Sequence, residues 1–160
     1  MTTYQWLLVF HIAGAFLLVS GATAAAALKV VALRSEQPRE IALLLRLALP
    51  AVVVTMVGMV VVLGFGLWLV VHIDGYDIGD GWIVAALLLW VVGSAAGEYG
   101  GRRAKPARKL AQQLVADGAG DAPSDELRRR LRDPVSNAVD ALSMAAMVAV
   151  LVLMVWKPGV

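Results

Sequence analysis

The chain has 160 residues, of which 60% are hydrophobic and 16% are charged. A soluble domain is about 45–50% apolar and about 25% charged, so this composition excludes an ordinary soluble protein and predicts one compact membrane domain covering residues 1–160. The chain has no cysteine, which excludes disulfides, thiolate catalysis and cysteine-based zinc or iron–sulfur sites. Its net charge of +2 comes from cations beside apolar runs, which favours anionic lipid head groups over nucleic acid as partners.

Four continuous apolar runs are long enough to cross a bilayer. A transmembrane helix needs about 20 apolar residues, because each residue adds about 1.5 Å across a hydrocarbon core about 30 Å thick. The runs do not alternate apolar with polar residues, which favours helices over barrel strands. We therefore predict an all-α, integral membrane four-helix bundle with up-down topology, whose spans are residues 4–28, 47–73, 78–97 and 135–156.

The first run is expected to be a retained helix, since residues 1–10 carry no charge and a secretory signal begins with cations. The connections then set the orientation. Thirteen of the fourteen cations lie in the first and third connections, residues 29–46 and 98–134, and the exception is Lys157. Lys and Arg mark cytoplasmic loops. We therefore expect a multi-pass protein of the bacterial cytoplasmic (inner) membrane with both termini outside (N-out/C-out).

Four of the five tryptophans support this orientation. Indole rings favour the head-group level of a bilayer. In the predicted topology four tryptophans, each at an end of a different span, lie near the outer leaflet: Trp6, Trp68, Trp82 and Trp156.

The cytoplasmic connection, residues 98–134, is too long to be bare loop and is predicted to be helical. Residues 102–116 place Arg102, Lys105, Lys109 and Gln112 on one face, which suits a helix along the membrane surface with Pro106 in its first turn.

A turn is expected at residues 118–123. Ser124 is the expected N-cap of a short helix that follows this turn. Asp133 is expected to cap the fourth span, with Pro134 at its first position.

Small residues mark two helix faces suited to close packing. One face of the first span repeats at alternating steps of three and four residues and should face inward: His11, Gly14, Leu18, Gly21 and Ala25. The third span ends in a GxxxG spacing, Gly93 to Gly97. Packing within the bundle is the favoured interpretation of this spacing, and the alternative is a homo-oligomer interface.

His11 is the leading candidate for chemistry, because an ionisable residue inside a membrane span is costly and often functional. Its imidazole could ligate a haem iron or another metal ion. The alternative is a structural hydrogen bond. His72, at the outer end of the second span, is a weaker candidate for a second ligand.

Two acidic features are expected to be structural. The segment from Asp74 to Asp80 holds three carboxylates beside His72, but its spacing is not that of a calcium loop, so an ordinary acidic external loop is favoured. Asp140 lies about one turn inside the fourth span. A carboxylate at that depth needs a partner, and Arg46 or Lys29 could supply an ion pair.

Three segments resemble a known family: His-Ile-Ala-Gly-Ala-Phe-Leu-Leu-Val-Ser-Gly at residues 11–21, Gly-Trp-Ile-Val-Ala-Ala at 81–86 and Val-Trp-Lys-Pro-Gly-Val at 155–160. They are similar to the predicted bacterial integral membrane proteins called domain of unknown function 2269. That family is itself distantly similar to copper-resistance D proteins and the J-type protoporphyrinogen oxidase. The oxidase pairs a first-span histidine, which His11 would match, with a third-span lysine. The third span here has no lysine, so the resemblance implies haem b as a candidate cofactor without implying the oxidase activity.

Two functions follow as hypotheses. The sequence has no serine–histidine–aspartate set, phosphate-binding loop or HExxH helix, which favours a non-enzymatic binding or assembly module. The alternative is a haem-b or metal-binding membrane redox protein with His11 as ligand.

Overall fold

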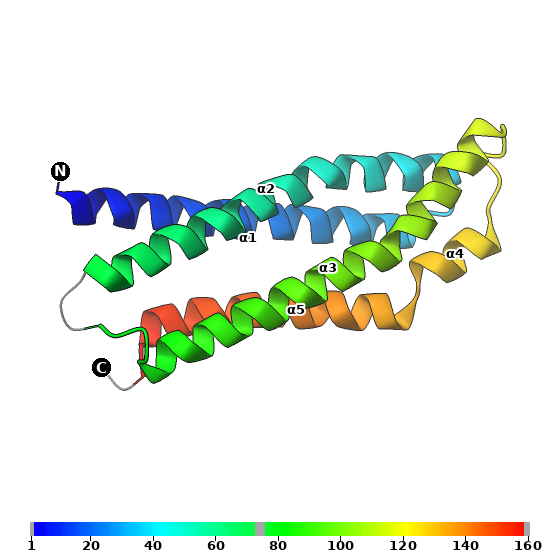
Figure 1. Ribbon diagram of the computed structural model, residues 1–160. Coiled ribbons are helices and arrows are strands. Elements are labelled where there is room, and N and C mark those ends of the chain that lie inside the picture. Colours follow the sequence, from blue (N-terminus) through cyan, green and yellow to red (C-terminus); the bar gives the residue numbers. More distant parts are fainter. Residues whose placement is uncertain (1, 73–75, 159–160) are drawn as a thin grey trace. The chain divides into compact units, whose positions relative to one another are not determined.

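The computed structural model describes residues 2–72 and 76–158, and within them all regular structure is helical. The helices are α1 (Thr3–Arg34), α2 (Pro38–His72), α3 (Gly81–Ala116), α4 (Asp125–Leu131) and α5 (Pro134–Trp156), shown in Figure 1. Four of the helices are long and apolar enough to cross a membrane, which confirms the predicted class. The up-down bundle and the outward termini stay predictions.

The long helices extend beyond the apolar runs. Helix α1 has 32 residues and α2 has 35, so each is about 50 Å long, against the roughly 30 Å of a hydrocarbon core. Helix α2 begins at Pro38, nine residues before the predicted start of the second span, because proline followed by Glu40 is a favourable helix start. The predicted end of that span, residue 73, lies outside the described residues.

The prediction of a separate surface helix at residues 102–116 is wrong. Helix α3 runs without a break from Gly81 to Ala116, and Pro106 lies inside it instead of in a first turn. Arg, Lys, Gln, Leu and Ala all favour helix, so the segment continues the span. Proline removes the helical hydrogen bond to the carbonyl of Arg102, and Pro50 does the same to Arg46 in α2. Both carbonyls lie beside the charged ends of apolar runs, where water can hydrate them.

The helix starts around α4 and α5 agree with the sequence. Ser124 caps α4 and accepts a hydrogen bond from the Leu127 N–H at 3.4 Å. The Asp133 carboxylate caps α5 by accepting from the N–H groups of Val135 and Ser136, with proline at the first helical position. The turn between α3 and α4 contains Gly118 with a φ of 77°, which glycine adopts without strain. These three predictions are confirmed.

The contacts divide the chain into two compact units. The first comprises Met1–Lys29 and Leu47–Asp80, and the second comprises Val30–Arg46 and Gly81–Val160. In the first unit α1 and α2 approach so closely that glycine is needed at the contact. A Cβ atom on Gly58 would overlap the backbone nitrogen of Leu18 and lie 2.8 Å from its Cα, and one on Gly14 would lie 2.8 Å from the Val62 nitrogen.

In the second unit α3 and α5 are antiparallel neighbours, as Figure 1 shows in green to yellow and in orange to red. Near one end the Lys157 ammonium lies 5.8 Å from the ring of Trp82, and near the other the Arg103 guanidinium bonds the Asp133 carboxylate at 2.9 Å. Arg103 lies 21 positions after Trp82 on α3, which corresponds to about 32 Å along the helix axis and matches the thickness of a hydrocarbon core.

Candidate functional site

The imidazole of His11 is anchored to α2. Its Nδ1 lies 2.9 Å from the carbonyl oxygen of Val62, and its ring lies against Gly66, where an added Cβ would be 2.9 Å from Cε1. A carbonyl oxygen can only accept, so Nδ1 carries the proton and donates. In the neutral ring, Nε2 then keeps its lone pair. A histidine held in this way is a common metal ligand, and it is equally a helix-to-helix contact within the membrane.

A row of aromatic rings runs along the first unit on the same two helices. The rings of Trp6, Phe10, Phe65 and Trp68 stack in turn, with centroids 5.0–6.3 Å apart, and Trp68 meets the His72 ring edge-on at 6.0 Å. Trp6 and Trp68 are each 49% exposed. The indole rings of Trp6 and Trp68 are amphipathic and suit a membrane interface, and their location near the outer leaflet stays a prediction.

The structure does not bring the two histidines together in one site. His11 contacts Val62 and Gly66 of α2, whereas His72 is exposed and contacts Trp68. Six residues separate Gly66 from His72, which is about 9 Å along the helix axis. Within the described residues there is no group of three His, Asp or Glu side chains placed to hold a metal ion.

The acidic segment after α2 forms a turn in its described part. The Asp77 carboxylate accepts from the N–H of Gly79 at 2.7 Å, and the Asp80 carboxylate accepts from the N–H of Asp77 at 3.1 Å. The carboxylates of Asp77 and Asp80 thus hold the start of α3. Asp74, the remaining carboxylate of that prediction, lies outside the described residues.

Small residues of α3 pack against a polar stripe of α5. An added Cβ on Gly93 would lie 3.1 Å from Cβ of Ala146, and one on Gly97 would lie 3.1 Å from the Ser143 hydroxyl oxygen. That hydroxyl donates to the carbonyl of Gly93 at 2.8 Å. The GxxxG face of the third span is therefore occupied by α5 of the same chain. Gly21 of the first span is packed in a similar way, since its added Cβ would lie 2.6 Å from the Thr55 hydroxyl oxygen of α2.

Asp140 lies further along the same stripe, with its carboxylate directly against Gly100, where no side chain fits. Ser136, one turn before it, is 4% exposed. The stripe therefore brings the Asp140 carboxylate and the Ser143 hydroxyl against glycine residues of α3. The ion pair of Asp140 with Arg46 stays a prediction.

The most deeply buried cluster lies beyond the apolar runs. We call this region the cap: it comprises residues 36–46, 98–116 and 117–133 of the second unit. Its core residues are 0–7% exposed: Ile41, Ala107, Ala111, Leu127 and Leu131. A segment outside the bilayer needs such a core, because burial of apolar surface stabilises a fold only against water. Sequence reasoning missed this core, although the spacing of Ala107 and Ala111 on α3 was a usable signal.

Ion pairs hold the periphery of the cap. Arg39 pairs with Asp121 at 3.4 Å, and Arg128 pairs with Glu36 at 3.5 Å. The backbone N–H of Arg39 also donates to the carbonyl of Gly120 at 3.0 Å. These contacts tie the start of α2 to the turn before α4 and to α4 itself.

Glu126 forms two ion pairs with arginines of α4. Its carboxylate accepts from Arg130 at 2.7 Å and from Arg129 at 2.9 Å. The hydrogen bond and the charge of Arg130, together with the charge of Arg129, lower the pKa of Glu126 below its usual value. The group is exposed, so this pairing adds little to the stability of the cap.

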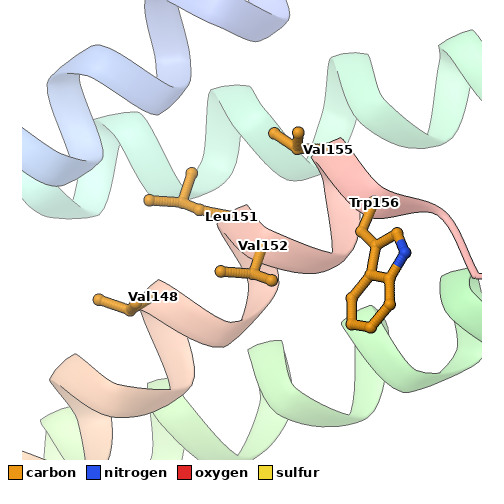
Figure 2. A pocket seen from close by; sticks show the side chains of 5 residues that line it. All are labelled: Val148, Leu151, Val152, Val155 and Trp156. Carbon is orange, nitrogen blue, oxygen red and sulfur yellow. The ribbon is translucent and has the colours of Figure 1, made fainter.

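An apolar hollow lies on the C-terminal half of α5. Figure 2 shows its lining, which is Val148, Leu151, Val152, Val155 and Trp156. Val155 and Trp156 are 87% and 77% exposed. The lining has one polar group, the indole N–H, so the hollow offers hydrophobic contact without groups for chemistry.

The long apolar helices and their glycine-mediated contacts define an integral membrane protein. The chain belongs to the family described as "Predicted integral membrane protein (DUF2269)", whose model matches residues 5–158. The resemblance noted from the three sequence segments is thereby confirmed. Comparison with curated proteins and with solved structures gives no match.

Proposed function

We propose that this protein is a non-enzymatic binding or assembly module of the bacterial cytoplasmic membrane, formed by four transmembrane helices with both termini outside and the cap in the cytoplasm. One observation carries the proposal. Polar side chains inside the spans are directed at helix backbone: His11 at Val62, Ser143 at Gly93 and Thr55 at Ala51. The bonds of His11 and Ser143 join two helices, which stabilises helix packing in lipid, and the bond of Thr55 lies within α2.

The placement of charge supports the cytoplasmic cap. The cap carries most of the cations of the chain, and the positive-inside rule assigns such segments to the cytoplasm. Its ordered core and ion pairs make it a rigid surface for a partner, which includes a second copy of the chain or the anionic lipids around it.

The proposal is tested by an absorption spectrum, a metal analysis and a measurement of the molecular mass in solution. The full chain is expressed with added haem precursor and purified in neutral detergent. It should show no absorption band at wavelengths longer than those of its aromatic residues and no stoichiometric metal. Light scattering after size exclusion then reports self-assembly. A haem band or one bound metal ion per chain would contradict the non-enzymatic module.

A second candidate function is supported by the hydrogen bond of His11. Because Nδ1 donates to Val62, the lone pair of Nε2 is the one that would ligate a haem iron or another metal. The protein would then be a haem-b or metal-binding redox protein. A Soret band that is lost in His11→Ala and retained in the matched variant His72→Ala would establish this function with His11 as ligand. Loss of the band in both variants would assign both histidines to the site.

A further inference from the structure

The boundary of the membrane on α3 can be placed from contacts within the second unit. Asp133 caps α5 immediately before its apolar run begins at Val135, and the same carboxylate bonds Arg103 of α3. Arg103 therefore lies at the level where α5 enters the apolar layer. The contact of Trp82 with Lys157 marks the opposite boundary, about 32 Å away along α3.

At and beyond this boundary α3 carries a basic strip, which we define as Arg102, Lys105 and Lys109. Successive residues of a helix turn by about 100°, so these three lie opposite the buried side of α3 at Ala107 and Ala111. All three basic side chains belong to exposed residues. The strip thus faces away from the core of the cap.

The strip contains positive charge that the protein does not balance. Within the described part of the chain, Arg102 pairs with Glu98 one turn away, whereas Lys105 and Lys109 make no ion pair. Elsewhere on the cap Arg39, Arg128, Arg129 and Arg130 each pair with a carboxylate, whereas Arg46, Arg108 and Arg132 make no ion pair with the described residues. The charges of Lys105 and Lys109 are therefore unbalanced on an exposed face of α3.

The strip lies at the depth of lipid phosphates. Along the helix axis Lys105 is about 3 Å and Lys109 about 9 Å beyond Arg103. The head-group layer on each side of a bilayer is about 5–7 Å thick. Helical side chains tilt toward the helix N-terminus, which for α3 is the direction of the membrane, so both ammonium groups can reach this layer.

We propose that the basic strip binds the phosphate groups of anionic phospholipids in the leaflet that faces the cap. The ammonium groups of Lys105 and Lys109 would each lie against a lipid phosphate. Arg102, already paired with Glu98, would border the site. This inference rests on the membrane module proposed above and names the lipid class that the module recruits.

The experiment measures lipid preference of the full chain reconstituted with phosphatidylcholine and a trace of spin-labelled lipid. Electron spin resonance gives the association of labelled phosphatidylglycerol relative to labelled phosphatidylcholine. The unmodified protein should prefer phosphatidylglycerol. The variant Lys105→Gln/Lys109→Gln should lose this preference by up to about fivefold per charge removed, since a cation near an anionic surface contributes about 1 kcal/mol.

The matched control is Arg129→Gln/Arg130→Gln, which removes the same net charge from residues already paired with Glu126. This control should keep the preference, and circular dichroism should show equal helix content in both variants. The proposal is overturned if the unmodified protein shows no preference, if the lysine variant keeps it, or if the control loses as much.

A different partner class has its own outcome. If a polyglutamate peptide binds the unmodified protein and not the lysine variant, while lipid preference is unchanged, the strip serves an acidic protein and the lipid proposal fails. The absorption spectrum of the same preparations tests the proposed function separately. A haem band would contradict the non-enzymatic module without altering the lipid measurement.

Discussion

Gly58 of α2 is the position where the packing of α1 on α2 is most sensitive to added volume. In Gly58→Ala the new methyl group would overlap the Leu18 nitrogen and lie 2.8 Å from both the Leu18 Cα and the Gly14 carbonyl oxygen. All three are backbone atoms, which cannot rotate away as a side chain can. The two helices must therefore separate or slide.

Gly64, on the same helix, provides the matched control, because an added Cβ there meets nothing within 4 Å. Alanine favours helix over glycine by up to about 1 kcal/mol at either site, so this gain cancels in the comparison. The difference between the variants then isolates the steric cost, which is about 1–3 kcal/mol for overpacking. We expect Gly64→Ala to be neutral or slightly stabilised and Gly58→Ala to be less stable than Gly64→Ala by that amount.

The assay is equilibrium unfolding in mixed micelles of dodecyl maltoside and dodecyl sulfate, followed by far-ultraviolet circular dichroism. The free energy of unfolding of each variant is compared with that of the unmodified chain. Equal values for the two variants, or a more stable Gly58→Ala, would refute the close backbone contact of α1 with α2.

Three further predictions concern the second unit. Leu127→Ala removes a side chain that is 1% exposed at the centre of the cap, so the cap should lose about 2–5 kcal/mol and limited trypsin digestion should cleave the arginine-rich α4 faster; unchanged cleavage would contradict a packed core. Ser143→Ala removes the hydrogen bond to Gly93 and should lower the free energy of unfolding by about 0.6 kcal/mol, whereas Ser20→Ala, whose hydroxyl bonds its own helix, should change it less. Because the pKa of Glu126 is lowered, its pairing with Arg130 stabilises the folded cap at pH values above the usual glutamate pKa of about 4.3. This stabilisation is lost as the pH falls through the lowered pKa. A carboxyl NMR titration should show the pKa of Glu126 rising in Arg130→Gln, and an unchanged midpoint would refute the pairing.

The sequence by itself determined the class of the protein and the starts of α4 and α5. Four apolar runs are sufficient for that, because the thickness of the hydrocarbon core sets the length of a spanning helix independently of what the helix contacts. The caps at Ser124 and Asp133 were also predictable, since a cap depends on hydrogen bonds within three residues. The family resemblance followed from short segments of the same spans.

Only the tertiary structure decided what each polar or small residue contacts. The sequence placed His11 and the glycines of α1 on one face, but their partners, Val62, Gly58 and Thr55, lie on a helix 34–51 residues later in the chain. The burial of Ala107 and Ala111 on α3 likewise depends on residues of α2 and α4. Local patterns report apolar runs and helix caps. The neighbours of a side chain depend on contacts between segments far apart in the sequence, and those contacts form only when the chain folds.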